Sequence, residues 1–303
     1  MMQSTSHLLM IQPVNFGFNT ETSVNNTFQK NIEGNVQQKA LQEFSDLVAL
    51  LRKNKIDVTV VEDSLDPATP DSIFPNNWIS FHDDGRIFLY PMFAVNRRFE
   101  KKAAVLDTVK HKFSVKEIVD LSSSEKEALF LEGTGSMVLD RENKIVYACL
   151  SPRTNEKILD EFCKITGYIP VTFKATDSTA IDIYHTNVMM CIAQTFAVIC
   201  LESVTDKEEK GRIINSLKKT NKEIVDISLQ QLNHFAGNML QVKNADEELL
   251  LVMSTQAFES LNDFQLEILQ RHNRIIHSSL NTIETAGGGS ARCMMAEVFL
   301  NLK

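Results

Sequence analysis

Apolar residues recur at intervals of three and four along five segments of the chain, the spacing that gathers them on one face of an α-helix. The segments predicted to be helical are Val36–Asn54, Arg97–Phe113, Thr154–Thr166, Asp206–Asn221 and Gln256–His272. A short strand follows each helix. These strands begin at Ile56, Ser114, Tyr168, Glu223 and Arg274, so the unit recurs every 51 to 58 residues. This constant interval predicts a chain built from five structural repeats.

Two apolar runs separated by turn residues follow each of these strands, a pattern typical of a β-hairpin. The last hairpin pattern begins at Ala286 and has no room for a second strand before Lys303, whereas residues His7–Phe16 supply a spare strand. A first strand that completes the last unit closes the five units into a ring without a free sheet edge. We therefore predict a single closed α/β domain over residues 1–303.

Composition excludes several classes of protein. The 303 residues are 43% hydrophobic and 23% charged, which is typical of a folded chain, and the net charge of −8 disfavours nucleic acid and anionic membrane surfaces as partners. The most apolar stretch, Val188–Leu201, has 14 residues and falls short of the ~20 that span a bilayer, so we expect two buried strands there. No basic residue precedes the first apolar run, so we expect no secretory signal and a cytoplasmic location.

The chain has five cysteines and no CxxC pair, which fits neither a disulfide framework nor a structural zinc site, and we expect no metal. Four of them, Cys149, Cys163, Cys191 and Cys200, lie in apolar surroundings where cysteine packs as a small hydrophobe. The fifth, Cys293, follows a glycine-rich stretch and Arg292. Only this cysteine has a setting that suggests chemistry.

The residues that open the five hairpin patterns are small or polar, and a ring would bring them together near its axis. They are Asn76-Asn77, Glu132–Thr134, His185–Asn187, Gly237-Asn238 and Ser290–Cys293. Burying an unpaired polar group costs about 1 to 3 kcal/mol, so such a gathering favours a polar site. Glu132, His185 and Cys293 together offer a thiol nucleophile, a proton shuttle and a carboxylate. Taken singly, His185 would more often be a hydrogen-bonded structural residue, and Glu132 a turn residue beside Gly133.

Three motifs in this arrangement resemble those of the guanidino-group-modifying superfamily. They are Glu132-Gly133-Thr134-Gly135, His185-Thr186-Asn187 and the stretch Gly287-Gly288-Gly289-Ser290-Ala291-Arg292-Cys293. Arginine deiminase, dimethylarginine hydrolase, agmatine deiminase and the arginine:glycine amidinotransferases belong to this superfamily. The resemblance covers the whole chain and implies a five-bladed β/α-propeller, the pentein fold, with pseudo-five-fold symmetry and no cofactor. It also implies Cys293 as the nucleophile, His185 as the general acid and base, and Glu132 as a ligand of the substrate nitrogens.

Two further motifs resemble those with which relatives bind the α-carboxylate of an amino acid. They are Arg97-Arg98-Phe99-Glu100 and Ser151-Pro152-Arg153-Thr154-Asn155. Arginine presents paired donors to a carboxylate, so Arg153 and one of Arg97 and Arg98 are candidate substrate ligands. The alternative for Arg97 and Arg98 is a solvated first turn of the predicted helix.

The chain departs from its arginine-processing relatives at two carboxylates. Asn77 and Asn187 stand where those relatives have aspartates that bind the guanidinium. Asparagine offers both a donor and an acceptor, which suits a neutral ureido group better than a cation. The chain looks most like the citrulline-utilisation hydrolases, which implies cleavage of citrulline to ornithine, ammonia and carbon dioxide. We expect Arg292, His185 and the glycine-loop amides to favour the Cys293 thiolate.

Two alternatives stay open. The chain could be an arginine deiminase or dimethylarginine hydrolase, with Glu132 as the one carboxylate on the guanidinium. It could also be a non-catalytic propeller scaffold or an amino-acid sensor, against which the combination of Cys293, His185 and Glu132 argues. We expect a small amino acid as the partner, and a homodimer is left open.

Overall fold

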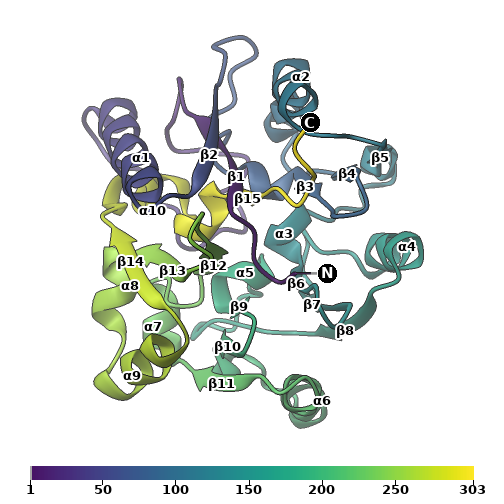
Figure 1. The fold of residues 1–303 in the computed structure, drawn as a ribbon, viewed down its shortest axis with the longest axis vertical. Helices are drawn as coiled ribbons and strands as arrows, with labels where there is room; N and C mark the ends of the chain where they lie inside the picture. Colours follow the sequence, from purple (N-terminus) through teal and green to yellow (C-terminus); the bar gives the residue numbers. More distant parts are fainter. Residues whose placement is uncertain (1) are drawn as a thin grey trace.

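Over the described residues, 2–303, the computed structural model has five sheets of three strands arranged in a ring (Figure 1). The strand orders are β15-β1-β2, β3-β4-β5, β6-β7-β8, β9-β10-β11 and β12-β13-β14. The strands are β1 His7–Gln12, β2 Asp57–Glu62, β3 Ile79–Phe81, β4 Arg86–Leu89, β5 Glu117–Asp120, β6 Val138–Asp140, β7 Ile145–Cys149, β8 Ile169–Phe173, β9 Met190–Ile192, β10 Phe196–Ile199, β11 Glu223–Asp226, β12 Leu240–Lys243, β13 Leu249–Ser254, β14 Arg274–Ser278 and β15 Ala296–Glu297. This is the predicted five-bladed α/β-propeller.

Each blade has two antiparallel strands, which form a hairpin in all but the closing blade, and a third strand that lies parallel to its neighbour. In the second blade, for example, β3 and β4 are antiparallel, and β5 lies parallel to β4 after a helical crossover. The last blade closes the ring as predicted. There β1 lies between β15, to which it is antiparallel, and β2, to which it is parallel, so Leu9 pairs with both Ala296 and Thr59.

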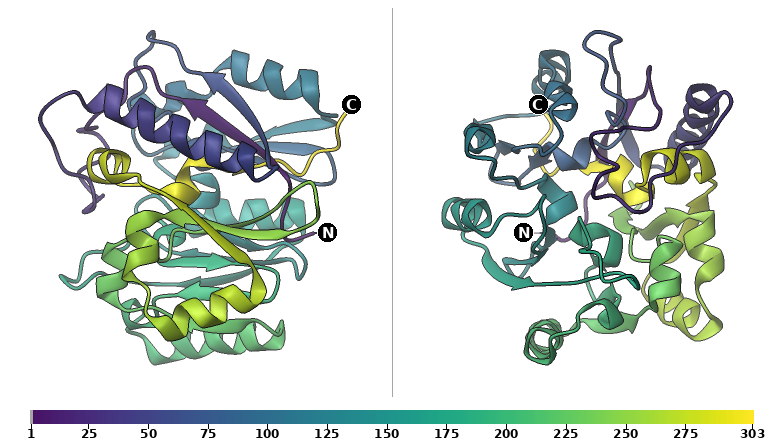
Figure 2. Two further views of the ribbon diagram at one scale, coloured as in Figure 1. Left: turned by 60° about the vertical axis from the view of Figure 1, so that its left-hand side comes forward. Right: turned by 180° about the vertical axis from the view of Figure 1, so that it is seen from behind.

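The longer helices lie around the outside of the ring (Figures 1 and 2). The α-helices are α1 Val36–Lys53, α2 Ala103–Lys112, α3 Gly133–Ser136, α4 Glu156–Thr166, α5 Thr186–Met189, α6 Lys207–Lys219, α7 Leu229–Asn233, α8 Thr255–Ser260, α9 Asp263–His272 and α10 Asn281–Gly287; the 3₁₀ helices are η1 Pro75–Asn77, η2 Asn96–Glu100, η3 Ser122–Glu127, η4 Leu201–Ser203 and η5 Ala291–Met294. Helix α4 shows how the sequence specifies them. The Asn155 side chain caps its first turn, its apolar stripe is buried, and Gly167 ends it in the left-handed conformation.

Two predicted helices differ from the structure. Residues Arg97–Phe113 are not one helix, because the 3₁₀ turn η2 holds Arg97 and Arg98 and α2 begins only at Ala103. Residues Gln256–His272 form two helices, because Asn262 makes a capping box with Gln265 that starts α9. Local capping outweighs continuous apolar spacing at this position.

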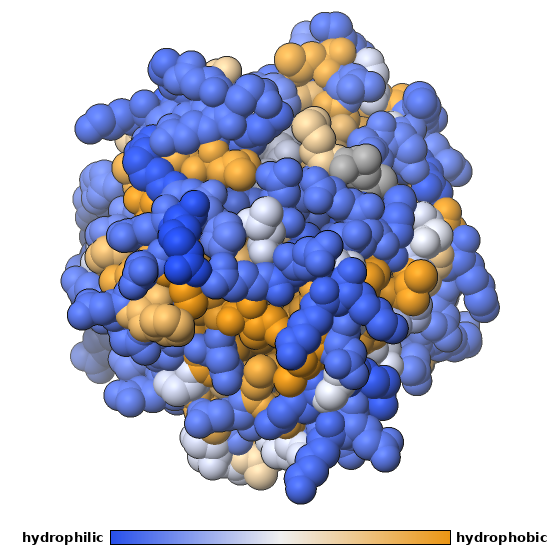
Figure 3. Space-filling view, turned by 60° about the horizontal axis from the view of Figure 1, so that its bottom comes forward, coloured by the Kyte–Doolittle hydropathy of each residue, from blue (hydrophilic) through white to orange (hydrophobic). Residues whose placement is uncertain are grey.

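Apolar side chains fill the space between the sheets and the helices. Cys149, Cys191 and Cys200 belong to one buried cluster and Cys163 to another, so the prediction that these four pack as small hydrophobes is confirmed. Within residues 2–303, no helix has both the length and the hydropathy needed to cross a membrane. The face in Figure 3 is mostly hydrophilic, with patches of apolar side chains between the charged ones.

Candidate active site

The residues that open the inner hairpins lie in short turns and not at strand starts. Asn77 ends η1, Glu132 precedes α3, His185 precedes α5 and Cys293 lies in η5. The prediction that Val188–Leu201 is wholly strand is wrong at its start, because Val188 belongs to α5. A turn can aim neighbouring side chains at one point, whereas a strand would send them to opposite faces.

These turns bring the predicted residues into one buried site at the centre of the ring. Glu132 has no exposed surface, and Asn187, His185, Asn77 and Cys293 expose between 1% and 3%. A small cavity between them is lined by Asn77, Arg97, Arg153, His185 and Cys293, together with Thr22, Asn26, Asp71, Phe74, Tyr184 and Gly287–Gly289. The cavity has a volume of about 10 Å³, room for about one water molecule. An amino acid therefore enters only when part of the wall moves.

Glu132 and His185 form a buried hydrogen-bonded pair. His185 Nε2 lies 2.8 Å from Glu132 Oε2, and the backbone N–H of Phe93 donates to Oε1 at 2.9 Å. Burial favours the neutral carboxyl of Glu132, but Arg153, the bond from His185 and Arg97 outweigh it and lower its pKa to about 2. Glu132 is therefore ionised at neutral pH.

The ionised carboxylate defines the tautomer of His185. A carboxylate accepts only, so Nε2 carries the proton and Nδ1 is left as a base. Burial lowers the pKa of His185 to about 4, against the raising effect of Glu132. A Cβ at Gly135 would lie 2.4 Å from Asn77 Nδ2 and 2.8 Å from His185 Nδ1, so only glycine fits beside these two side chains.

Two asparagine amides contact the sulfur of Cys293. The Nδ2 groups of Asn187 and Asn238 lie 3.4 Å and 3.3 Å from Sγ. Burial nevertheless raises the pKa of Cys293, which contradicts the expectation of a favoured thiolate. The charge of Arg292 lowers this pKa, but by less than burial raises it, and its guanidinium bonds Glu297 at 2.7 Å and the Met295 carbonyl at 2.8 Å instead of the sulfur.

The two arginines of the Arg97-Arg98 motif have different positions. Arg97 is buried and donates to Asn77 Oδ1 at 2.8 Å and to both carboxylate oxygens of Glu100 at 2.8 and 3.0 Å. Arg98 is half-buried and donates to the carbonyls of Met92 and Phe93. The structure therefore brings Arg97 into the cavity wall and leaves Arg98 outside it, and neither lies in a solvated helical turn.

Arg153 is held by a loop between β1 and α1. Its guanidinium donates to the Thr22 carbonyl at 2.7 Å and to Asn25 Oδ1 at 2.8 Å, and it lies 3.6 Å from Glu132 Oε2. The same loop reaches the glycine-rich stretch, where Asn26 Nδ2 donates to the Gly288 carbonyl at 3.3 Å. Residues 19–29 thus cover the cavity, and this segment is seen in front of the ring in Figure 2, right.

Sequence reasoning missed three features of this site. Asp71 is buried in the cavity wall and its Oδ1 has no hydrogen-bond partner in the part of the chain that the structure describes. Asn238 touches the sulfur, although the sequence had marked it only as an opening residue of the fourth hairpin. The repeat itself was the signal for Asn238, since Asn187 occupies the corresponding place one unit earlier. The covering loop has no periodicity, and nothing in its composition indicates a role.

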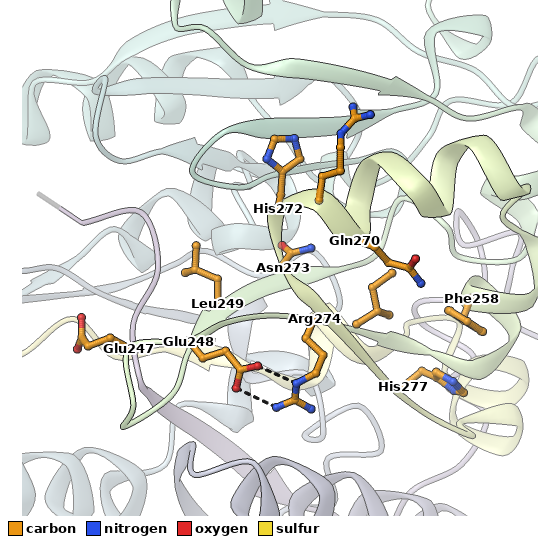
Figure 4. A pocket seen from close by; sticks show the side chains of 11 residues that line it. Glu247, Glu248, Leu249, Phe258, Gln270, His272, Asn273, Arg274 and His277 are labelled. Atoms are coloured by element: carbon orange, nitrogen blue, oxygen red, sulfur yellow. Dashed lines mark hydrogen bonds and ion pairs between the residues drawn. The ribbon is translucent and has the colours of Figure 1, made fainter.

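A wider groove of about 760 Å³ runs along β14, away from Cys293 (Figure 4). Its charged side chains are already paired, as Arg274 is with Glu248 at 2.8 and 2.9 Å. The buried cavity at the ring centre is the one that holds reactive groups.

A thiol, a histidine and a carboxylate that meet at the centre of a five-bladed α/β-propeller define the class of the guanidino-group-modifying penteins. Residues 12–300 match a family model described as N,N dimethylarginine dimethylhydrolase, eukaryotic, and the chain belongs to this family. No curated protein sequence matches the chain.

Solved structures share the fold at low sequence identity. The arginine dihydrolase ArgZ from cyanobacteria superposes with a TM-score of 0.76 at 18% identity over 96% of this chain, which spans 40% of that protein. Its N-terminal domain, a variant bound to substrate, gives 0.75 at 17% identity, with 97% and 99% of the two chains covered. The dimethylarginine hydrolase (DDAH) from Pseudomonas aeruginosa, a variant complexed with citrulline, gives 0.68 at 14%, with 98% and 100% covered. The chain thus spans about two fifths of the full-length dihydrolase.

Proposed function

We propose that this protein hydrolyses the ureido group of citrulline, producing ornithine, ammonia and carbon dioxide, with Cys293 as the nucleophile. The observation that carries the proposal is the neutral character of the groups that touch the sulfur. Asn187 and Asn238 reach Sγ with amides, and the carboxylate of Glu132 is already engaged by His185, Arg153 and Arg97. A guanidinium placed at Sγ would find no carboxylate among the groups that touch the sulfur, whereas a ureido group needs none.

The amide of Asn187 offers a hydrogen-bond acceptor to a ureido group. Asn187 Oδ1 is buried and has no partner among the described residues, so it can accept a bond from a ureido N–H. An unsatisfied buried acceptor costs about 1 to 3 kcal/mol, which binding of such a donor recovers. Citrulline brings this donor without bringing a charge.

The amino-acid end of the substrate fits the other side of the cavity. Arg153 would bind the α-carboxylate once the loop oxygens of Thr22 and Asn25 leave its guanidinium. The free Oδ1 of Asp71, whose other oxygen accepts from Asn19 at 2.8 Å and Thr22 at 3.0 Å, would accept from the α-ammonium group. Burial raises the pKa of Asp71, and a bound cation would counter this effect.

The reaction follows from the protonation states of Cys293 and His185. The thiol gives its proton to His185 Nδ1 as Sγ bonds to the ureido carbon, and His185 passes this proton to the departing nitrogen of ornithine. The product on the enzyme is a carbamoyl thioester. A water molecule, deprotonated by His185, then releases carbamic acid and restores the thiol; carbamic acid breaks down to ammonia and carbon dioxide.

The comparisons support cysteine chemistry on such substrates. A cysteine-to-serine variant of the ArgZ domain is bound to substrate, and an asparagine-to-serine variant holds a covalent reaction intermediate. A cysteine-to-serine variant of the Pseudomonas hydrolase is complexed with citrulline. The second candidate is hydrolysis of arginine or dimethylarginine, which the family model favours.

The test is a product assay on the purified chain with citrulline, arginine and asymmetric dimethylarginine, each supplied separately. We expect ornithine and ammonia from citrulline, with no citrulline formed from the other two. The Cys293→Ser variant should form no product, while Cys163→Ser, a buried cysteine outside the cavity, should retain activity. Citrulline accumulating from arginine or dimethylarginine would support the second candidate, and no turnover of any of the three would contradict catalysis.

A further inference from the structure

Two neighbouring blades each send one asparagine to the sulfur of Cys293. Asn187 and Asn238 lie at the inner openings of the third and fourth hairpins, 106 and 55 residues from Cys293 along the chain. Their side chains expose 1% and 0% of their surface. Water therefore does not compete for the N–H···S contacts.

Hydrogen bonds determine the orientation of the Asn238 amide. Its Oδ1 accepts from the backbone N–H of Arg292 at 3.0 Å, so this atom must be the oxygen. Its Nδ2 then has two hydrogens, of which one goes to the Asn187 carbonyl at 2.8 Å and the other to Sγ. The amide of Asn238 is thus a fully satisfied donor that can face only the sulfur.

The charged groups around the sulfur have other partners. His185 and Glu132 bind one another, Arg97 binds Glu100, Arg153 binds the loop and Arg292 binds Glu297. Asp71, on the far wall, carries the same sign of charge as a thiolate. No cation among the described residues bonds Sγ directly. Its polar contacts are the two side-chain amides and the backbone of Ser290, each of which lowers the pKa of Cys293 against the effect of burial.

We propose that Asn187 and Asn238 form an amide pair that holds the sulfur of Cys293 and stabilises its thiolate during turnover. The inference rests on the proposed function, in which Cys293 is the nucleophile. An N–H group bonds an anionic sulfur more strongly than a neutral one, because the bond is charge-assisted. Two such donors therefore oppose the effect of burial on the thiol. They do so without adding a charge that would select a charged substrate.

The two asparagines have different roles in this proposal. Asn238 is fixed by three hydrogen bonds and serves as a positioning donor that touches the reacting atom. Asn187 donates to the same sulfur and keeps Oδ1 free for the ureido nitrogen, so it links thiolate stabilisation with substrate recognition.

The test is the pH dependence of Cys293 alkylation by iodoacetamide, followed by mass spectrometry in the absence of substrate. The Asn238→Asp variant keeps an oxygen for the Arg292 N–H but replaces the donor to Sγ by an acceptor. We expect its alkylation midpoint to rise by about one pH unit or more, with a rate at neutral pH ~10-fold lower. The exposed Asn301→Asp variant is the matched control and should behave as the unchanged protein.

A second variant covers the case in which Asn238→Asp does not fold. Asn187→Ala removes the donor to Sγ and leaves the backbone carbonyl that accepts from Asn238, and it should raise the midpoint in the same direction. An unchanged midpoint in either folded variant would overturn the amide pair and leave the proposed function standing. Normal alkylation behaviour with no citrulline turnover in the unchanged protein would instead overturn the proposed function.

Discussion

We expect substrate choice in this site to depend on the absence of charge at two side chains, Asn77 and Asn187. Asn77 Oδ1 already accepts from Arg97, and Asn187 Oδ1 is free, so aspartate at either place keeps an acceptor and loses a donor. A ureido oxygen needs a donor, whereas a guanidinium has donors alone. Exchange of these asparagines for aspartates should therefore weaken the binding of a ureido group and favour the binding of a guanidinium.

The double variant Asn77→Asp, Asn187→Asp should bind citrulline more weakly and gain measurable affinity for arginine. Each unfavourable contact costs about 1 to 3 kcal/mol, or ~5- to 150-fold in binding. Calorimetric titration of both ligands in a Cys293→Ala background, with and without the two aspartates, measures the change without turnover. Stronger binding of arginine than of citrulline before the aspartates are introduced would show the amide argument to be wrong.

Glu284 has a buried carboxyl group that is hydrogen-bonded to Ser290, next to the glycine-rich stretch. Its oxygens accept from Ser290 Oγ at 2.6 Å and Gln256 Nε2 at 2.7 Å, and the Ser290 carbonyl accepts from the Cys293 backbone at 2.9 Å. Burial raises the pKa of Glu284 to about 7, although these bonds act in the opposite direction. The folded protein therefore favours its protonated form.

This shift predicts how Glu284 affects stability. A carboxyl group with a raised pKa contributes stability in full below its ordinary value of 4.5 and loses it as pH rises through about 7. The neutral variant Glu284→Gln should therefore gain in Tm relative to the unchanged protein between pH 5 and pH 8. Thermal unfolding across this range measures the difference, with the exposed Glu259→Gln as control. A Tm difference independent of pH would contradict the assignment.

At the scale of elements, the loop between β1 and α1 competes with the substrate for Arg153. The Asn25 side chain and the Thr22 carbonyl occupy the guanidinium that we assign to the α-carboxylate. In the proposed binding mode, these hydrogen bonds to Arg153 must break before the α-carboxylate of an amino acid binds there. We therefore expect closure of the loop to lower the apparent affinity for substrate.

Asn25→Ala removes one of these competing acceptors. The variant loses a charge-assisted hydrogen bond to Arg153 that exists only while the loop is closed over the cavity, so the closed form becomes less stable. We therefore expect KM for citrulline to fall by on the order of 10-fold, with kcat little changed. Steady-state kinetics measures the two constants. The neighbouring Val24→Ala, at a side chain that is 71% exposed, is the control. A raised KM would show instead that Asn25 holds the loop over bound substrate.

At the scale of the whole molecule, the N-terminal segment bonds to blades that are remote from it in sequence. Gln3 Nε2 donates to the carbonyls of Leu139 in β6 and Ile192 in β9, and its Oε1 accepts from the Arg141 N–H at 2.7 Å. The Thr5 hydroxyl donates to the Val298 carbonyl at 2.7 Å. The segment crosses the middle of the ring in Figure 1. It thereby adds bonds to two neighbouring blades that also contact each other directly through β6 and β9.

Gln3→Ala leaves three buried backbone groups without this partner and should lower the free energy of unfolding by about 1 to 3 kcal/mol. Urea denaturation measures the loss, and Gln42→Ala on the exposed face of α1 is the control of the same residue type. A change no larger than that of the control would show that the blades hold together without this side chain.

The repeat could be predicted from the sequence because its signals are local. Apolar spacing along each helix and the constant interval between strands were enough to predict five blades, the closure by β1, and the convergence of Glu132, His185 and Cys293. Each helix or strand must bury its apolar face, whichever element it packs against. The apolar pattern is therefore visible in the sequence before the packing partner is known.

The finer features of the site depend on contacts between distant residues, which periodicity does not encode. Arg153 meets Asn25 across 128 positions and Asn187 meets Cys293 across 106. The place of Arg97 inside the cavity and of Arg98 outside it follows from a 3₁₀ turn that apolar spacing does not reveal. The acidity of Cys293 depends on burial and on which donors reach the sulfur. These are properties of packing, because a hydrogen bond or a desolvated charge exists only once the neighbouring blades are in place.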